Sequence, residues 1–293
     1  MDIGLRAAST MSAGPELIAV KLPYREASKP ALKTILVYAL RNAAYLLPAL
    51  GLAVMIKYHY SRAGSEDLRW ILSPTARLVE LFSGIPFVEE LHSGFINRSR
   101  RILIAPACAG VNFLIIAFGV AVLASLRHIR KIALQMTWLA AALASAYILT
   151  IFVNAVRIVA SIYSYEARPF SSWIDPPRLH LFEGVVIYSF FLIVFYRIIE
   201  AGLCRAGQRA PARSEEKQKA LAAMTAALPL FCYLTVTLLI PLLNGAARAD
   251  ARRFVEHAAI VLAASGAIGL FFWPRLGWSR LRDRLKRRTA NEK

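Results

Sequence analysis

The sequence predicts an all-α fold, a polytopic transmembrane helical bundle of about six spans plus one interfacial helix. Of the 293 residues, 57% are hydrophobic, and the mean hydropathy is +0.49. This composition is typical of a membrane protein rather than of one or two soluble domains. The second observation is a series of apolar runs that approach or exceed the roughly 20 residues a helix needs to span hydrocarbon. Helices satisfy their own backbone hydrogen bonds there, so each such run predicts a membrane span.

Four runs contain no Lys, Arg, Asp or Glu and predict the clearest spans: 109–126, 132–156, 220–247 and 258–274. Two further spans are predicted at 34–56 and at 181–199. The first contains Arg41, which must snorkel to the interface or pair. The second contains Glu183 near one end.

The segment 68–87 differs from the six runs because Ser73-Pro74, Arg77 and Glu80 interrupt it. It predicts an interfacial or re-entrant helix. These elements divide the chain into five predicted parts: a cytoplasmic N-terminal segment 1–33, a transmembrane domain 34–200, a charged cytoplasmic linker 201–219, two additional transmembrane helices within 220–274, and a basic cytoplasmic tail 275–293.

The formal net charge of +18 could favour binding to nucleic acid or to a membrane surface. The basic residues stand beside predicted spans, where they set orientation and contact anionic lipid headgroups, so no nucleic-acid partner is expected. The short basic segments "RHIRK" at 127–131 and "RAGQRAPARSEEKQK" at 205–219 should be cytoplasmic. Six spans then place both termini in the cytoplasm.

This orientation brings three reactive residue types to the outer side of the membrane. Cys108 opens the second span, Arg157 closes the third, and His180 opens the fourth. Each alone has an ordinary structural explanation, since a lone Cys in an apolar helix is usually a small hydrophobe and Arg or His at a helix end is usually an anchor. Three such residues at one depth and on one side are much less expected by chance.

Local sequence strengthens the interpretation of these residues as a site. Pro106 favours a helix start, so Cys108 should lie in or near the first turn, where free amides and the helix dipole favour a thiolate. Asn154 and Arg157 are three residues apart and should share one helix face. In "HLFEG", Gly184 follows His180 by four residues and lets another helix approach beside it.

The other two cysteines, Cys204 and Cys232, are predicted to be structural and too far from Cys108 to form a disulfide. The Cys and His residues show no CxxC or HxxxH spacing, so neither a metal nor a cofactor is expected.

At these positions the sequence resembles the exosortase and archaeosortase family of polytopic membrane cysteine transpeptidases. The resemblance lies in "PACAGVNF" with Cys108 and Gly110, "NAVRI" with Asn154 and Arg157, and "HLFEG" with His180 and Gly184, in the family's order, and it covers about residues 35–200. The "CAGVNF" form, with Ala109 where many members have Ser, resembles the exosortase K subgroup most.

The resemblance implies a membrane-embedded peptidase or transpeptidase in a bacterial inner membrane, with its active site facing the periplasm or exterior. Its substrate would be an exported, membrane-anchored protein with a C-terminal sorting signal. Cys108 would form a thioester, His180 would transfer protons, and Arg157 would stabilise the oxyanion.

A non-enzymatic membrane protein is the alternative, either a transporter or a scaffold for surface-polymer export. Arg41 and Arg157 would then line a solute path. A transporter needs polar groups through the midplane, whereas the central parts of the second, third and fourth predicted spans are nearly all apolar. The pattern therefore favours a site at the outer surface.

Overall fold

The structure is a computed structural model that describes residues 37, 40–126, 128–167, 175–206 and 227–291. The chain forms two compact units, Met1–Arg41 and Asn42–Lys293, and every element described below belongs to the second. The predicted N-terminal segment 1–33, and the predicted linker from residue 207 onward, lie outside the described residues.

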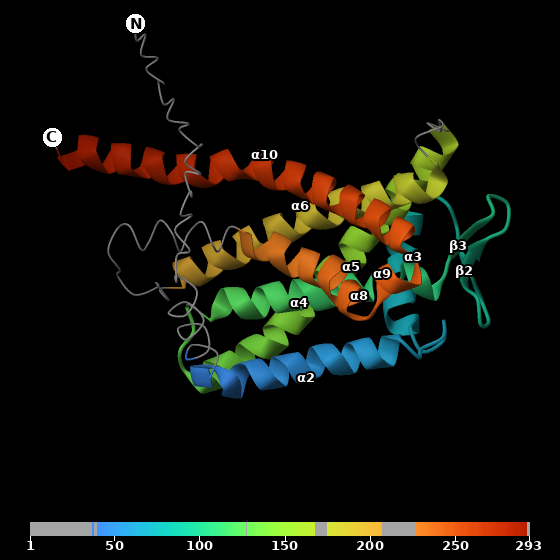
Figure 1. Cartoon of the computed structure of the whole chain (residues 1–293), viewed down its shortest axis with the longest axis horizontal. Helices are drawn as coiled ribbons and strands as arrows, with labels where there is room; N and C mark the ends of the chain where they lie inside the picture. The colour runs from blue at the N-terminus through green and yellow to red at the C-terminus, as the bar shows by residue number, and fades with distance from the viewer. Residues whose placement is uncertain (1–36, 38–39, 127, 168–174, 207–226, 292–293) are drawn as a thin grey trace, which may run out of the picture. The chain divides into compact units, whose positions relative to one another are not determined.

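Helices make up most of this second unit (Figure 1). The first five in chain order are α2 (Ala43–Tyr60), α3 (Arg69–Ser83), α4 (Val111–Ser125), α5 (Ile132–Ala167) and α6 (Pro176–Arg205). An apolar helix over Ala227–Leu243 follows, and the π-helical turn η2 (Thr235–Leu239) and α8 (Ile240–Leu243) form its second part. The last elements are α9 (Ala246–Ala249) and α10 (Ala251–Asn291).

The predicted helical transmembrane fold is confirmed. Four helices within the described ranges are long and apolar enough to cross a membrane: Pro106–Ser125, Ile132–Ala167, Pro176–Arg205 and Ala251–Phe271. They contain the second, third, fourth and sixth predicted spans, apart from the last residues of the second and the sixth. Helix α2 and the helix Ala227–Leu243 overlap the described parts of the other two, but neither belongs to the four.

Helices α2, α5, α6 and α10 extend beyond the predicted bounds, α5 and α10 the furthest. α5 continues past residue 156 to Ala167, and α10 continues past residue 274 to Asn291, so the predicted basic tail continues the helix as far as residue 291.

A small antiparallel sheet, which the sequence analysis did not predict, precedes the cysteine. Its strands are β1 (Val88–Glu90), β2 (Gly94–Asn97) and β3 (Ile102–Ile104), in the order β1-β2-β3. Phe95 of β2 pairs with Ile104 of β3. Asn97 closes the connection to β3, because its Oδ1 accepts from the backbone N–H of Arg100 at 2.8 Å. The sheet fixes the chain just before Cys108.

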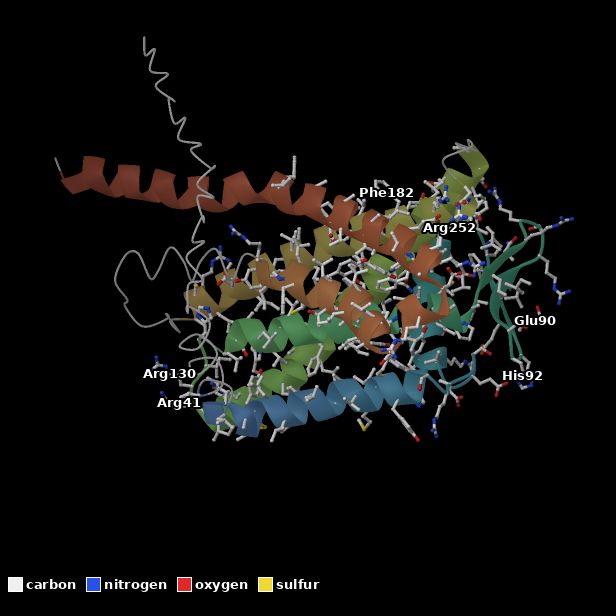
Figure 2. The ribbon with its side chains drawn as sticks, in the orientation of Figure 1. Arg41, Glu90, His92, Arg130, Phe182 and Arg252 are labelled. Carbon is white, nitrogen blue, oxygen red and sulfur yellow. The ribbon has the colours of Figure 1, made fainter. Side chains whose placement is uncertain are left out.

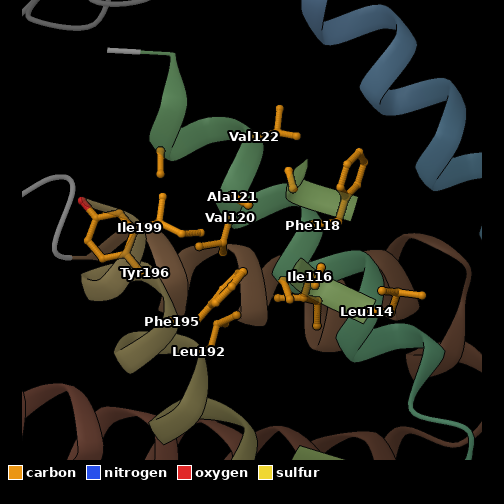
Figure 3. Close-up of a cluster of buried hydrophobic side chains, with 14 of the residues drawn as sticks. Leu114, Ile116, Phe118, Val120, Ala121, Val122, Leu192, Phe195, Tyr196 and Ile199 are labelled. Carbon is orange, nitrogen blue, oxygen red and sulfur yellow. The ribbon is translucent and has the colours of Figure 1, made fainter. Parts of the chain in front are cut away.

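The core of the bundle surrounds α4. This helix is apolar all round and contacts α2, α5 and α6, as expected of a helix in the centre of a bundle. Figure 3 shows its side chains, among them Phe118 and Val120, with Leu192 and Phe195 of α6 in the same cluster. At the far end of α4 the Ser125 hydroxyl lies 2.9 Å from the Tyr45 hydroxyl of α2.

Helix α3 is the predicted interfacial helix, with bounds of Arg69–Ser83 instead of 68–87. Ile71, Leu72 and Val79 on one face are fully buried against a second apolar cluster, to which α5 contributes. Its exposed face includes Leu81, a large apolar residue. Such a two-sided helix is typical of a segment lying along a membrane interface.

The loop between α4 and α5 and the small sheet lie at opposite ends of the bundle. Arg130, in the loop between α4 and α5, lies at one end in Figure 2, and Glu90 and His92 of the sheet region lie at the other. Because β3 leads into α4 through Cys108, the cysteine lies at the end with the sheet.

Candidate active site

Cys108 lies in a short turn between the sheet and α4. Residues Pro106–Cys108 form a 3-10 turn, and the Cys108 N–H donates to the Ala105 carbonyl at 2.8 Å. The sequence analysis expected Cys108 in or near the first turn of the helix, and it lies in this 3-10 turn, three residues before α4 begins at Val111. Gly110 separates the two, with a left-handed φ of 70° that a residue without Cβ adopts readily. Cys108 is half-buried and free of disulfides.

Asn154 holds this turn against α5. It is fully buried, and its amide nitrogen donates to the Cys108 carbonyl. A Cβ at Gly110 would lie 3.1 Å from Asn154 Cγ, so the turn approaches the amide more closely than a side chain there would easily allow. Two of the three predicted supporting residues, Asn154 and Gly110, therefore fix the backbone of the cysteine.

Arg157 follows Asn154 by three residues, and its guanidinium joins α5 to α6. One terminal nitrogen, Nη1, donates to the Tyr188 hydroxyl at 3.0 Å, and the other, Nη2, contacts His180 Nε2. A Cβ at Gly184 would lie 3.2 Å from Arg157 Nε, so the close approach expected beside His180 is that of the arginine. Nε is buried without a hydrogen-bond partner among the residues the structure describes.

His180 lies in the first two turns of α6, which begins at Pro176 after the N-cap Asp175. Its second ring nitrogen, Nδ1, lies 3.0 Å from Ser161 Oγ. Ser161 Oγ donates in turn to Glu183 Oε2 at 2.8 Å. The imidazole is therefore contacted on both nitrogens, by Arg157 on one side and by Ser161 on the other.

Tyr188 connects the cysteine turn to the arginine. Its hydroxyl accepts from Arg157 and donates to Asn154 Oδ1 at 3.0 Å. Its ring stacks on Phe113 of α4 with a centroid distance of 4.6 Å. A continuous set of hydrogen bonds thus runs from the Cys108 carbonyl through Asn154, Tyr188 and Arg157 to His180.

The end of α2 borders the same site. Burial and, next, the electrostatic interaction with Cys108 raise the pKa of the Tyr60 phenol above its ordinary value. Lys57, one turn earlier, donates to Asn112 Oδ1 at 2.8 Å, at the start of α4. The surroundings of Cys108 therefore include a neutral phenol and a cation that sequence reasoning did not select.

Sequence reasoning also missed Tyr188 and Ser161, and it noted Glu183 only as a charge near the end of a span. Spacing contains a signal for them. Ser161 follows Arg157 by four residues, and Glu183 follows His180 by three, so each lies on the same helix face as its partner. Which polar residues of the two helices meet depends on how the helices cross.

Arg178, two residues before His180, lies close to two carboxylates. Its guanidinium lies 3.6 Å from the Asp175 carboxylate and 3.4 Å from that of Glu256 on α10. All three side chains are partly exposed, so these pairs contribute little to stability.

A protein-family model described as transmembrane exosortase matches residues 34–197, a stretch that includes all six predicted site residues. Comparison with curated proteins and with solved structures gave no match.

Proposed function

Because the chain belongs to the transmembrane exosortase family, whose members are membrane cysteine transpeptidases, we propose that it cleaves the C-terminal sorting signals of exported, membrane-anchored proteins. The supporting observation is the hydrogen-bonded network that joins the Cys108 turn, Arg157 and His180. Family membership favours this function over the alternative of a transporter or scaffold.

The proposed reaction begins at the thiol. Cys108 gives its proton to His180 and attacks the scissile carbonyl carbon, whose oxygen becomes an oxyanion that accepts hydrogen bonds from Arg157. The C–N bond then breaks as His180 returns the proton to the leaving amine, and a thioester remains on Cys108. Water or an acceptor amine attacks the thioester carbonyl and releases the thiol.

The surrounding residues suit this reaction. The Asn154 amide donates a hydrogen bond to the Cys108 carbonyl, which restricts rotation of the turn that contains the nucleophile. Tyr188 keeps the Arg157 guanidinium beside the turn. Preorganised donors of this kind avoid reorganisation during the reaction and are usually the largest single contribution to catalysis.

We place the site on the periplasmic or exterior side of a bacterial inner membrane. The support is that the basic loop containing Arg130 lies at the end of the bundle opposite the sheet (Figure 2), and basic connections favour the cytoplasm. Anionic headgroups would neutralise that loop. The substrate would be an exported protein anchored by its C-terminal helix. The resemblance to the exosortase K subgroup stays a prediction.

The test is mass spectrometry of envelope and secreted proteins from cells with the wild-type gene, without it, and with Cys108→Ala. We expect one or more proteins to keep their C-terminal anchor in the last two, while Cys108→Ala still inserts normally. Cys204→Ala and Cys232→Ala are the matched controls and should process normally. Processing by Cys108→Ala would exclude the thiol as the nucleophile.

A further inference from the structure

A hydroxyl and a carboxylate form a short chain on the side of the His180 ring away from Arg157. Nδ1 lies 3.0 Å from Ser161 Oγ, and Ser161 Oγ lies 2.8 Å from Glu183 Oε2. Ser161 comes from α5 and Glu183 from α6, the same helix as His180. All three side chains are partly buried, which reduces competition from water for these hydrogen bonds.

The Glu183 carboxylate determines which atoms donate and which accept in these hydrogen bonds. A carboxylate only accepts hydrogen bonds, so the Ser161 hydroxyl hydrogen points toward Glu183. Ser161 Oγ then offers lone pairs to the ring, and Nδ1 of a neutral imidazole must hold the proton. Nε2 is left with its lone pair, and it faces the guanidinium of Arg157, which only donates. Both contacts of the ring therefore require the same tautomer.

We propose that Ser161 and Glu183 are positioning residues that fix the Nδ1–H tautomer of His180 and keep Nε2 as the proton acceptor of the site. This inference rests on the proposed function. Arg157 holds the same tautomer only while its guanidinium faces Nε2. When the guanidinium turns to an oxyanion, the Ser161–Glu183 chain remains to orient the ring.

Ser161 and Glu183 exchange no proton with the substrate. Nε2 takes the proton from the Cys108 thiol, and the positive charge of the resulting imidazolium is stabilised through Nδ1–H, Ser161 and the Glu183 carboxylate. Nε2 then gives that same proton to the leaving amine. Ser161 and Glu183 end the cycle as they began it.

The kinetic test uses substitutions that keep the shape of the site. In Glu183→Gln an amide can donate to Ser161, which frees the hydroxyl hydrogen to point at Nδ1 and removes the fixed direction. We expect kcat to fall about 10- to 100-fold, the range seen when partners that orient a functional imidazole are removed, with KM unchanged. Ser161→Ala should match it, and Ser161→Thr, which retains the hydroxyl, should restore most of the activity.

Non-additivity separates positioning from a general structural role. The double variant Ser161→Ala with Glu183→Gln should be no slower than the slower single variant, because both residues act through one chain. In a His180→Ala background, neither change should cost anything further. Ser164→Ala and Glu166→Gln, neighbours on α5, are the matched controls and should stay within a few-fold of wild type. Additive losses, or a loss that persists without His180, would overturn the proposal.

A second measurement reads the tautomer directly and needs no substrate. Nitrogen-15 NMR of the full chain with labelled histidine, in detergent micelles, distinguishes a protonated from an unprotonated ring nitrogen, and His180→Gln assigns the signal. We expect Nδ1–H in the wild type and in Arg157→Met, and a mixture when Glu183→Gln is added. A mixture in Arg157→Met alone would overturn this inference, whereas processing by Cys108→Ala would overturn the proposed function.

Discussion

Replacing Arg157 by Lys keeps the charge and removes the planar fork. The guanidinium contacts two groups at once, the Tyr188 hydroxyl at 3.0 Å and His180 Nε2, and its carbon lies 5.3 Å from the centre of the Tyr188 ring. A lysine ammonium is a compact point charge on a flexible stem and cannot reproduce two parallel directions of donation. The substitution therefore tests the geometry of the site separately from its charge.

The expected size of the effect follows from a count of donors. A guanidinium has five N–H groups; one contacts Tyr188, one contacts His180, and Nε is buried against Gly184. Once His180 Nε2 holds the thiol proton it no longer accepts, so three N–H groups on the terminal nitrogens of Arg157 are left for an oxyanion. A lysine that keeps the Tyr188 contact has two. Loss of one oxyanion donor costs about 3 to 4 kcal/mol, so we expect Arg157→Lys to lower kcat about 100- to 1,000-fold.

The assay is processing of the cognate substrate at matched amounts of folded protein in the membrane. Arg178→Lys is the control, because the ion pairs of Arg178 with Asp175 and Glu256 are partly exposed, and exposed pairs are worth about 0 to 1 kcal/mol. It should stay within a few-fold of wild type. Equal activity of the two variants would show that Arg157 is an ordinary interfacial cation and would refute the role proposed for it.

Two further predictions concern orientation and the turn at the cysteine. Reporter fusions after Lys131 and after Lys219 should both behave as cytoplasmic, and an alkaline phosphatase signal at either would invert or break the proposed topology. Gly110→Ala should lower the free energy of unfolding in detergent micelles by about 1 to 2 kcal/mol, because φ is 70° there and the new Cβ would crowd Asn154. Gly119→Ala, where a Cβ meets nothing within 4 Å, should be neutral or stabilising; equal losses at both glycines would contradict this account of the turn.

The small sheet shows why part of the fold was not predictable. Its strands have only three or four residues, too few for an alternating pattern to stand out, and β1 consists of Val88 and two glutamates. Side-chain hydrogen bonds to the flanking backbone also stabilise the sheet: Asn97, the last residue of β2, donates from its side chain to the Pro86 carbonyl at 2.7 Å. Hydropathy does not detect such contacts. Cys108 lies in a separate turn because β3 ends at Ile104 and the 3-10 turn Pro106–Cys108 connects it to α4.

The sequence by itself determined the helical membrane fold, because apolar length and the need to satisfy backbone hydrogen bonds in lipid are local properties of the chain. It also selected Cys108, Arg157 and His180 as candidate site residues, through residue types and motif spacing. Only the tertiary structure decided which side chains join them. Tyr188 reaches Asn154, and Ser161 reaches Glu183, because α5 and α6 pack with their polar faces together. Spacing places a residue on a helix face, but the crossing of two helices selects its partner.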